Sequence, residues 1–163
     1  MNIRIPWGHV SVLMVWIIIF AVVYLYFDGR QAPKVAVVKG GLARGEVVIP
    51  RSRDGHYYIR GAINGYPIDF MVDTGASIVS VSHEFSRLAN LPGGATANFS
   101  TAGGVVQGEI VSGQVIEAGG IAVAGLSVSV GIQGEIALLG QNFLRRVDVI
   151  QSNDTMILRV RME

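Results

Sequence analysis

One short motif in the chain combines residue types and a position that could do chemistry. Asp73 directly follows the apolar run Phe70 to Val72 and is followed by Thr74 and Gly75. A carboxylate at the end of an apolar strand is costly to bury alone, so it requires a partner or the neutral state. Glycine lets backbone and ligand approach closely, and the threonine hydroxyl can hold the loop by hydrogen bonding. The motif predicts a rigid loop that presents a carboxyl group, although a simple turn-capping aspartate would have the same three residues.

The composition of the 163-residue chain excludes several other kinds of site. Cysteine is absent, which rules out disulfide scaffolds, zinc–thiolate sites, iron–sulfur clusters and cysteine nucleophiles. A multi-histidine metal site would need all three histidines, His9, His56 and His83. The formal net charge of +1 leaves no excess of Lys and Arg for a phosphate backbone. We therefore expect no metal, no cofactor and no nucleic-acid partner.

One segment near the N-terminus is far more apolar than the rest. Residues 10–27 carry no charge, and as a helix they would span about 27 Å, close to a bilayer core of about 30 Å. A cleaved signal peptide would end in small residues, whereas this run ends in Tyr24-Leu25-Tyr26-Phe27. A core helix would show a polar face, which is missing here. The pattern predicts a retained transmembrane helix over 10–27, after a short tail over 1–9.

The segment after this helix has the composition of a tether. Residues 28–45 contain a proline and a Gly-Gly pair, and they show no sustained period of 2 or 3.6. Basic residues flank the apolar run on both sides, so the charge bias leaves its orientation in the membrane open. We predict a linker over 28–45 and one folded domain over 46–163.

The remaining sequence has the pattern of short strands separated by turns. Asn64-Gly65 lies between the apolar segments 57–63 and 66–72, which is the strongest short-range signal of a hairpin. The other predicted elements are hairpins with arms at 97–100 and 105–111 and at 115–117 and 121–123, strands over 126–132 and 155–161, and short helices over 82–89 and 141–146. Strands at this spacing predict an all-β barrel or sandwich.

Two separated motifs carry a family resemblance. The first is the apolar run that ends in Asp73-Thr74-Gly75-Ala76, and the second is Ala137 to Leu144, an apolar strand, a glycine and a short helix. Between them, residues 99–108 look like a flap hairpin. In this order the motifs resemble the retropepsin-like aspartic proteases, specifically the bacterial group with a single membrane anchor. The resemblance covers about residues 57–160 and implies a closed all-β barrel with a flap hairpin and one short C-terminal helix.

The resemblance also implies roles for the motif residues. They are Asp73 for catalysis; Thr74, Gly75 and Ala76 for support of the active site; Thr101, Ala102, Gly103 and Gly104 for the flap that binds substrate; and Leu139, Gly140 and Asn142 for support from the second motif. Ala76 matches the viral enzymes and implies a mildly acidic optimum. Where those enzymes commonly pair an acidic residue with an arginine, this chain has Ser77 and Gln141, which could form only a neutral pair.

The number of catalytic carboxyl groups in one chain determines the oligomeric state that the resemblance implies. Aspartic protease chemistry needs two carboxyl groups that share one proton, and this chain has one Asp-Thr-Gly in about 115 soluble residues. We therefore expect a C2 homodimer in which each subunit supplies one Asp73 to activate a water against an extended peptide. The bacterial group implies an inner-membrane protein whose protease domain faces the periplasm.

Two other function classes stay open on the sequence alone. A membrane-tethered dimer of the same fold could bind extended peptides or partner proteins without cutting them. A structural β-domain of a membrane complex would not need Asp73 at all. An inactive relative would typically have lost Asp, Thr or Gly, and all three are present here, which favours an aspartic endopeptidase.

Overall fold

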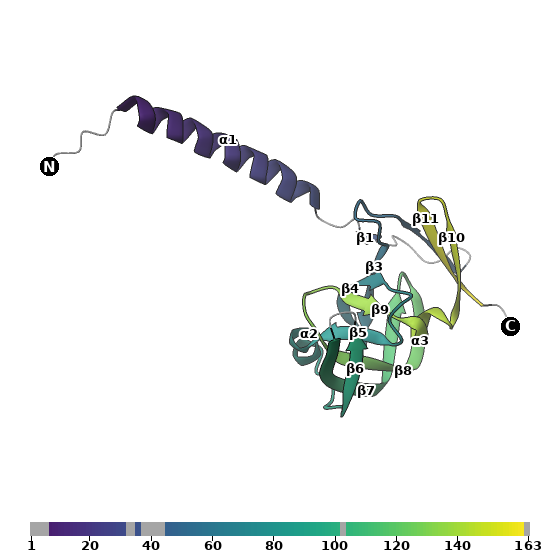
Figure 1. Cartoon of the computed structure of the whole chain (residues 1–163). Coiled ribbons are helices and arrows are strands. Elements are labelled where there is room, and N and C mark those ends of the chain that lie inside the picture. Colours follow the sequence, from purple (N-terminus) through teal and green to yellow (C-terminus); the bar gives the residue numbers. More distant parts are fainter. Residues whose placement is uncertain (1–6, 32–34, 37–44, 102–103, 162–163) are drawn as a thin grey trace. The chain divides into compact units, whose positions relative to one another are not determined.

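The computed structural model describes residues 7–31, 35–36, 45–101 and 104–161, which belong to two separate units (Figure 1). The first contains one helix, α1 (Trp7–Gln31), whose described side chains are all exposed. Its segment Val10–Phe27 has a mean hydropathy of 2.6 and is long and apolar enough to cross a membrane, a test that a signal sequence also passes. The helix contains the segment predicted from the sequence and extends beyond it at both ends.

The second unit consists mostly of strands. Its elements are β1 (Val35–Ala36), β2 (Glu46–Pro50), β3 (Tyr58–Ile63), β4 (Tyr66–Val72), β5 (Val79–Ser82), α2 (His83–Leu88), β6 (Ala95–Thr101), β7 (Gly104–Ala118), β8 (Ile121–Ile132), β9 (Ala137–Leu139), α3 (Gln141–Leu144), β10 (Val147–Ser152) and β11 (Thr155–Val160). The predicted all-β class is confirmed.

The larger of two sheets closes into a barrel. Its strand order is β1-β3-β4-β9-β5-β8-β7-β6, and β3 also pairs with β7, so six of the strands form a ring. The closing register sets Gly61 opposite Ala118 and Ile63 opposite Ile116. A smaller sheet, β10-β11-β2, is formed by the C-terminal hairpin and the first strand of the domain (Figure 1). The closed barrel inferred from the family resemblance is therefore present.

The barrel is held together by one apolar core. Ile68, Phe70 and Val72 are the buried positions of β4, and every second residue lies on the other face, as a strand requires. Leu139 of β9 and Phe143 of α3, which come much later in the sequence, belong to the same core and have no exposed surface. Each such side chain contributes about 1.5–3 kcal/mol on burial. The core therefore joins the two halves of the chain that carry the two motifs.

The predicted hairpins form, with two differences in how their strands are divided. Asn64 and Gly65 have positive φ of 51° and 86°, as the predicted type I′ turn requires. The segments 105–111 and 115–117 are parts of one strand, β7, whose pairing with β8 shifts register between Val111 and Ile116. A bulge of this kind bends a strand without ending it. The predicted strands 121–123 and 126–132 are likewise parts of one strand, β8. The prediction of separate strands was wrong in both places, because an irregularity in the pairing interrupts the sequence pattern without ending the strand.

Two segments were only partly anticipated. Within the predicted linker, α1 continues to Gln31, and β1 pairs in parallel with Tyr58 and Ile59 of β3. The barrel also has a second short helix, α2, whose start matches the sequence signal, because the Ser82 side chain accepts a hydrogen bond from the Phe85 amide. The domain thus contains α2 in addition to the single C-terminal helix that the resemblance implied.

Candidate active site

Asp73 begins the connection between β4 and β5 and is held in a tight turn. Its Oδ1 accepts a hydrogen bond of 2.8 Å from the Gly75 amide, and its carbonyl oxygen accepts one of 3.3 Å from the Ala76 amide. The residue is half-buried, and within the described part of the chain its Oδ2 has no hydrogen-bond partner. One carboxyl oxygen is therefore fixed by the backbone while the other stays available to a reactant.

The second motif lies alongside the first. Strand β9 pairs in parallel with the end of β4, so that Val72 lies opposite Leu139. The Asp73 amide donates to the Leu139 carbonyl oxygen at 3.2 Å. The loop that carries Asp73 is thus fixed at its base by a strand far along the chain.

The start of α3 closes over the same loop. The amides of Gln141 and Asn142, which lack partners within the helix, donate to the carbonyl oxygens of Ala76 and Ser77 at 2.8 and 3.1 Å. Gly140 makes this approach possible, because a Cβ at that position would collide with the Ile78 carbonyl oxygen and lie 2.9 Å from that of Ala76. The Asp73 loop can therefore pack against the start of α3 only because the second motif has a glycine at position 140.

Two amide side chains add to the contacts from β9 and α3 that hold the Asp73 loop, and we call this set of contacts the brace. Asn142 accepts a hydrogen bond from the Val79 amide at 3.0 Å and donates to the Ser127 carbonyl oxygen at 2.7 Å. Gln141 donates to the Thr74 carbonyl oxygen at 2.9 Å. The neutral pair considered for Ser77 and Gln141 is thus replaced by a contact from Gln141 to Thr74. Gln141 was not among the predicted site residues, and its place directly after the glycine of the second motif was the available signal.

A buried hydroxyl chain supports the far end of the loop. The Ser129 hydroxyl donates to that of Ser80 at 2.7 Å, and Ser80 donates to the Ile78 carbonyl oxygen at 3.2 Å. Both serines are buried, 5% and 8% exposed, among apolar neighbours of β8 and β5. Sequence reasoning missed this pair, because alternating serines in a strand look like its solvent-facing side.

The predicted flap is the end of the β6–β7 hairpin. Thr101 and Gly104 are paired in that hairpin, and Gly104 has a positive φ of 113°. Next to the turn, Val105 is 72% exposed, which leaves an apolar side chain free to meet another molecule. Ala102 and Gly103, the other predicted flap residues, lie outside the described residues.

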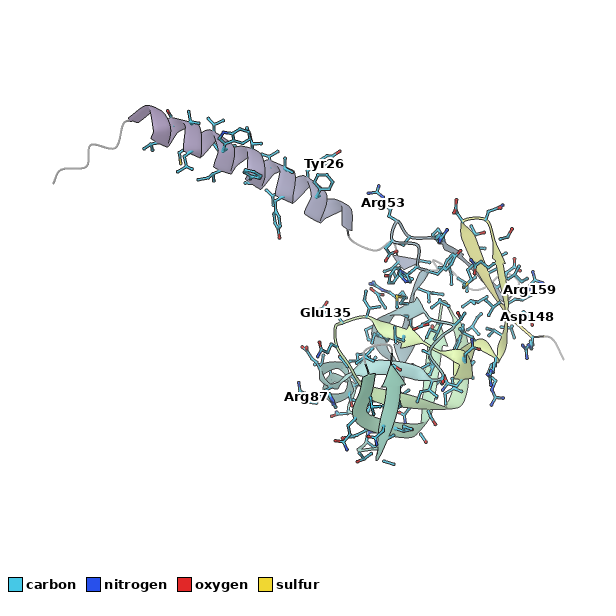
Figure 2. The ribbon with its side chains drawn as sticks, viewed as in Figure 1. Tyr26, Arg53, Arg87, Glu135, Asp148 and Arg159 are labelled. Carbon is cyan, nitrogen blue, oxygen red and sulfur yellow. The ribbon has the colours of Figure 1, made fainter. Side chains whose placement is uncertain are left out.

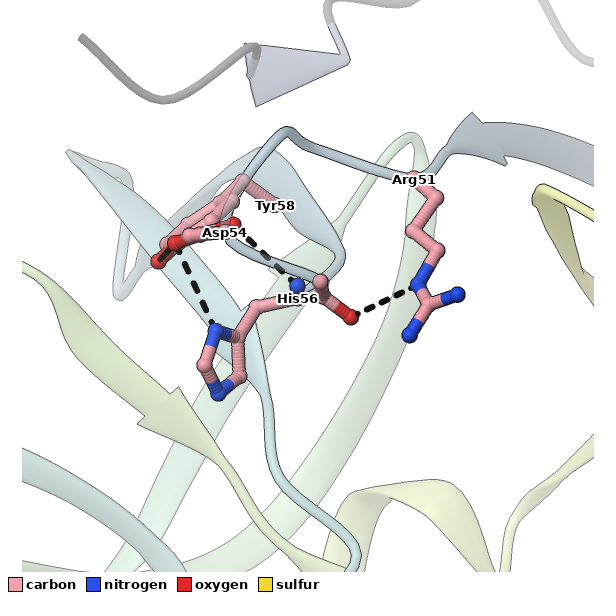
Figure 3. Close-up of polar contacts among 5 residues, drawn as sticks. Arg51, Asp54, His56 and Tyr58 are labelled. Atoms are coloured by element: carbon pink, nitrogen blue, oxygen red, sulfur yellow. Dashed lines mark hydrogen bonds and ion pairs between the residues drawn. The ribbon is translucent and has the colours of Figure 1, made fainter. Parts of the chain in front are cut away.

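A second loop holds an aspartate in a similar turn (Figure 3). Asp54 Oδ1 accepts from the His56 amide at 3.1 Å, and Oδ2 accepts from the Tyr58 hydroxyl at 2.6 Å. The hydrogen bond from Tyr58 is the main cause that lowers the pKa of Asp54. Burial, followed by the same hydrogen bond, raises the pKa of Tyr58 to about 12. Arg51 fastens the loop by donating to the Gly55 carbonyl oxygen at 3.0 Å. Both oxygens of Asp54 are therefore occupied.

The predicted residues of both motifs thus come together around Asp73. The arrangement offers one half-buried carboxyl group on a braced loop, suited to proton transfer if a second acidic group lies opposite. Among residues 7–31, 35–36, 45–101 and 104–161, no three His, Asp or Glu side chains gather as metal ligands would.

Known proteins share this sequence and fold. A retropepsin-like aspartic protease from Rickettsia conorii has a crystal structure that matches with a TM-score of 0.60 and 32% identity, covering 71% of this chain and 91% of that one. An uncharacterized protein of Rickettsia prowazekii (strain Madrid E) is 52% identical over 40 residues, 24% of this chain. An uncharacterized protein in the cobV 5′ region of Sinorhizobium sp is 29% identical over 134 residues, 78% of this chain. The matches span 17% and 57% of these two relatives' own lengths.

The family match covers both motifs. Residues 59–146 match the family described as "gag-polyprotein putative aspartyl protease", and they extend from β3 through the Asp73 loop to the residues just after α3. With more than half of its length matched and a retropepsin-like fold, the chain belongs to this aspartyl protease family.

Proposed function

We propose that the protein is an aspartic endopeptidase that works as a membrane-anchored homodimer, with Asp73 of each subunit forming the catalytic dyad. The observation that carries the proposal is the braced loop, in which the Gly75 amide holds one oxygen of Asp73 and the other is open. An open carboxyl oxygen on a rigid loop is what a group that exchanges a proton with a bound water requires. The alternative of a module that binds without cutting is an outcome of the test below.

The dimer follows from the chemistry of the reaction. Two carboxyl groups a few ångströms apart cannot both ionise easily, so one of them stays protonated in the active enzyme. The chain has a single Asp-Thr-Gly, so the second carboxyl group is assigned to Asp73 of the partner subunit. A two-fold axis through the site makes both subunits contribute the same loop. Anchoring both chains in one membrane raises their effective concentration.

The dyad would act on a water bound between the two carboxyl groups. The ionised carboxylate takes a proton from the water, whose oxygen attacks the peptide carbonyl carbon. The protonated carboxyl group donates its proton to the carbonyl oxygen as the tetrahedral intermediate forms. When the C–N bond breaks, the carboxyl group that took the proton from water gives it to the leaving nitrogen. The other carboxylate takes back a proton from a hydroxyl of the intermediate, whose carbon becomes the new carboxyl group. One proton is thus shared at the start and again at the end of each cycle.

The other motif residues would position this reaction. Thr74, Gly75 and Ala76 shape the loop, and Leu139, Gly140 and Asn142 hold it against β9 and α3. Residues 101–104 at the end of the β6–β7 hairpin would close over an extended peptide and exclude water. Ala76 offers no hydroxyl to the dyad, so we expect a mildly acidic optimum.

The N-terminal helix would supply the anchor. Val10–Phe27 has the length and hydropathy of a single span. We propose the order tail 1–9, span 10–27, linker 28–45 and protease domain 46–163, with the domain on the periplasmic side of the inner membrane. A cysteine introduced into the protease domain should react with a membrane-impermeant reagent in intact spheroplasts if the domain is periplasmic. Absence of labelling would place the domain in the cytoplasm.

The test compares the two aspartates that sit in similar turns. The full-length chain in detergent micelles is incubated with a mixed peptide library from about pH 3 to about pH 8, where dyad titration should give a bell-shaped profile. Asp73→Asn should lower kcat/KM by on the order of 10³-fold, as expected for a group that reacts with substrate. Asp54→Asn, the matched control, should leave the rate within about twofold, because Asp54 lies in a separate loop.

Two results would contradict the proposal. One is cleavage that survives Asp73→Asn, which would place the chemistry elsewhere. The other is absence of cleavage by a chain shown to be folded and dimeric, which would favour the peptide-binding module. Sedimentation of the same preparation gives the oligomeric state.

A further inference from the structure

A hollow lies beside the loop that carries Asp73, between β8 and the segment after α3. It has a volume of about 780 Å³. Ile78 and Leu126 give it apolar surface, Asn142 adds an amide, and Arg145, Arg146 and Arg161 line the rest. Volume and mixed lining are those of sites that bind a side chain or small ligand.

The charge of this hollow is strongly positive. Arg145 and Arg146 are exposed, and within the described ranges neither forms an ion pair. Arg161 donates to Asp148 Oδ1 at 3.1 Å and to the Val147 carbonyl oxygen at 3.3 Å. Asp148 thus offsets one of three positive charges. Two guanidinium groups remain free to pair with a carboxylate, for which their planar fork is well suited.

The position of the hollow relates it to the proposed chemistry. Ile78, which lines it, lies five residues after Asp73, so the two are within about 17 Å even if the chain were fully extended. A peptide strand rises about 3.3 Å per residue. A substrate residue that reaches the Ile78 side of the hollow would therefore lie within about five residues of the bond that is cut.

We propose that this hollow recognises an acidic side chain, Asp or Glu, of the substrate at a position remote from the cleaved bond. The inference rests on the proposed function and adds a substrate class to it. The carboxylate would pair with Arg145 and Arg146, while Ile78 and Leu126 pack against the neighbouring part of the peptide. In a two-fold dimer the hollow occurs twice, so the preference applies on both sides of the cleaved bond.

The test starts from the best-cleaved library peptide. Each of the five positions on either side of the cleaved bond is replaced in turn by Glu, Gln or Lys, and kcat/KM is measured with the full-length chain in micelles. At one or more positions Glu should exceed Gln by about fivefold, the range of a partly exposed ion pair. The advantage should shrink in high salt, because salt screens exposed charges.

Three variants assign the preference to the hollow. In the double variant Arg145→Gln/Arg146→Gln, the ratio of kcat/KM for the Glu peptide to that for the Gln peptide should fall to about one, because the two free guanidinium groups are gone. The matched control is Arg87→Gln, which removes an exposed arginine on α2, away from Asp148 and β10 (Figure 2), and should keep the ratio. Arg145→Lys/Arg146→Lys, which keeps the charge, should keep part of the ratio. Circular dichroism checks that each variant is folded.

Failure of this inference and failure of the proposed function are distinguishable. Cleavage without a Glu preference at any position, or with one that survives the double glutamine variant, overturns the inference and leaves the endopeptidase standing. If no peptide is cleaved, two versions of the mixed library, one with Glu and one with Gln at a fixed position, are compared for binding to the full-length chain by fluorescence anisotropy. A Glu preference that depends on Arg145 and Arg146 would then uphold the hollow and overturn the endopeptidase.

Discussion

The two aspartate loops of the domain differ in where their support comes from. Asp54 is held by neighbours within four residues, the His56 amide and the Tyr58 hydroxyl. Asp73 also has local contacts, from the Gly75 and Ala76 amides, but its loop is held in addition by β9 and α3. A locally closed loop uses both carboxyl oxygens for itself, whereas support from elsewhere leaves one oxygen of Asp73 open. In this domain the aspartate that is supported from distant parts of the chain is the one that keeps an open carboxyl oxygen, as the proposed function requires.

Gly140→Ala should have the largest effect of the substitutions that separate the two loops. The added Cβ would collide with the Ile78 carbonyl oxygen, so α3 must move off the Asp73 loop. We expect unfolding to become easier by about 3 kcal/mol, as for other overpacked sites, and peptidase activity to disappear. The matched control is Gly93→Ala, because nothing lies within 4 Å of a Cβ there. Thermal denaturation of both variants measures the difference, and equal stability would mean that the contact at Gly140 is dispensable.

Asn142→Ala should loosen the brace without a collision. It would leave the Val79 amide and the Ser127 carbonyl oxygen without their side-chain partner. The expected loss is about 2 kcal/mol, since unsatisfied groups in a partly buried place carry a desolvation penalty. Asn98→Ala, at an exposed position of β6, is the control for stability. If urea denaturation gave the same midpoint for both variants, the side-chain brace would be irrelevant to the loop.

Tyr58→Phe should have the smallest effect and should stay confined to the other loop. It removes the hydrogen bond that lowers the pKa of Asp54, so that pKa should rise toward its ordinary value in an NMR titration. The expected loss of stability is about 1 kcal/mol at neutral pH, and peptidase activity should not change. Tyr66→Phe, at an exposed tyrosine, is the control. A change in the rate of peptide cleavage would show that the two loops are coupled.

The same tyrosine gives the domain a dependence on alkaline pH. In the folded chain its pKa is raised to about 12 from an ordinary 10.0, so the folded state retains a proton that the unfolded state loses. This stabilisation is complete below about pH 10 and is lost as the pH rises toward about 12. Stability of Tyr58→Phe should therefore fall less over this window than that of the wild-type chain.

The features that sequence could predict are those encoded by neighbouring residues. Asn64-Gly65 specified its turn, Ser82 its helix start, and the uncharged run 10–27 a long apolar helix. The Asp73 loop and the Gly140 motif were also found, because each is a short contiguous pattern. That Gly140 fits against Ile78 was out of reach, since a collision between distant backbones leaves no local pattern.

The features that sequence could not predict depend on partners far along the chain. Alternation gives the faces of β5 and β8, yet nothing in it tells that Ser80 and Ser129 are both buried and hydrogen-bonded to each other. Gln141 was noted as a departure from the viral enzymes, but its partner Thr74 follows only from the parallel pairing of β4 with β9. The Asp54 loop was missed although Asp54-Gly55 is a turn signal, because the contact with Tyr58 needs the fold of the loop.

The large sequence separation of the residues that form the brace also bears on when the site forms during folding. Gln141 and Thr74 are 67 residues apart in sequence, and Asn142 and Val79 are 63 apart. Contacts with such separations form late, because the intervening chain must lose its freedom before they are made. A growing chain that has reached Asp73 but not Asn142 carries the Asp73 carboxyl group without its supports. The proposed peptidase activity would then arise only when the barrel is nearly complete.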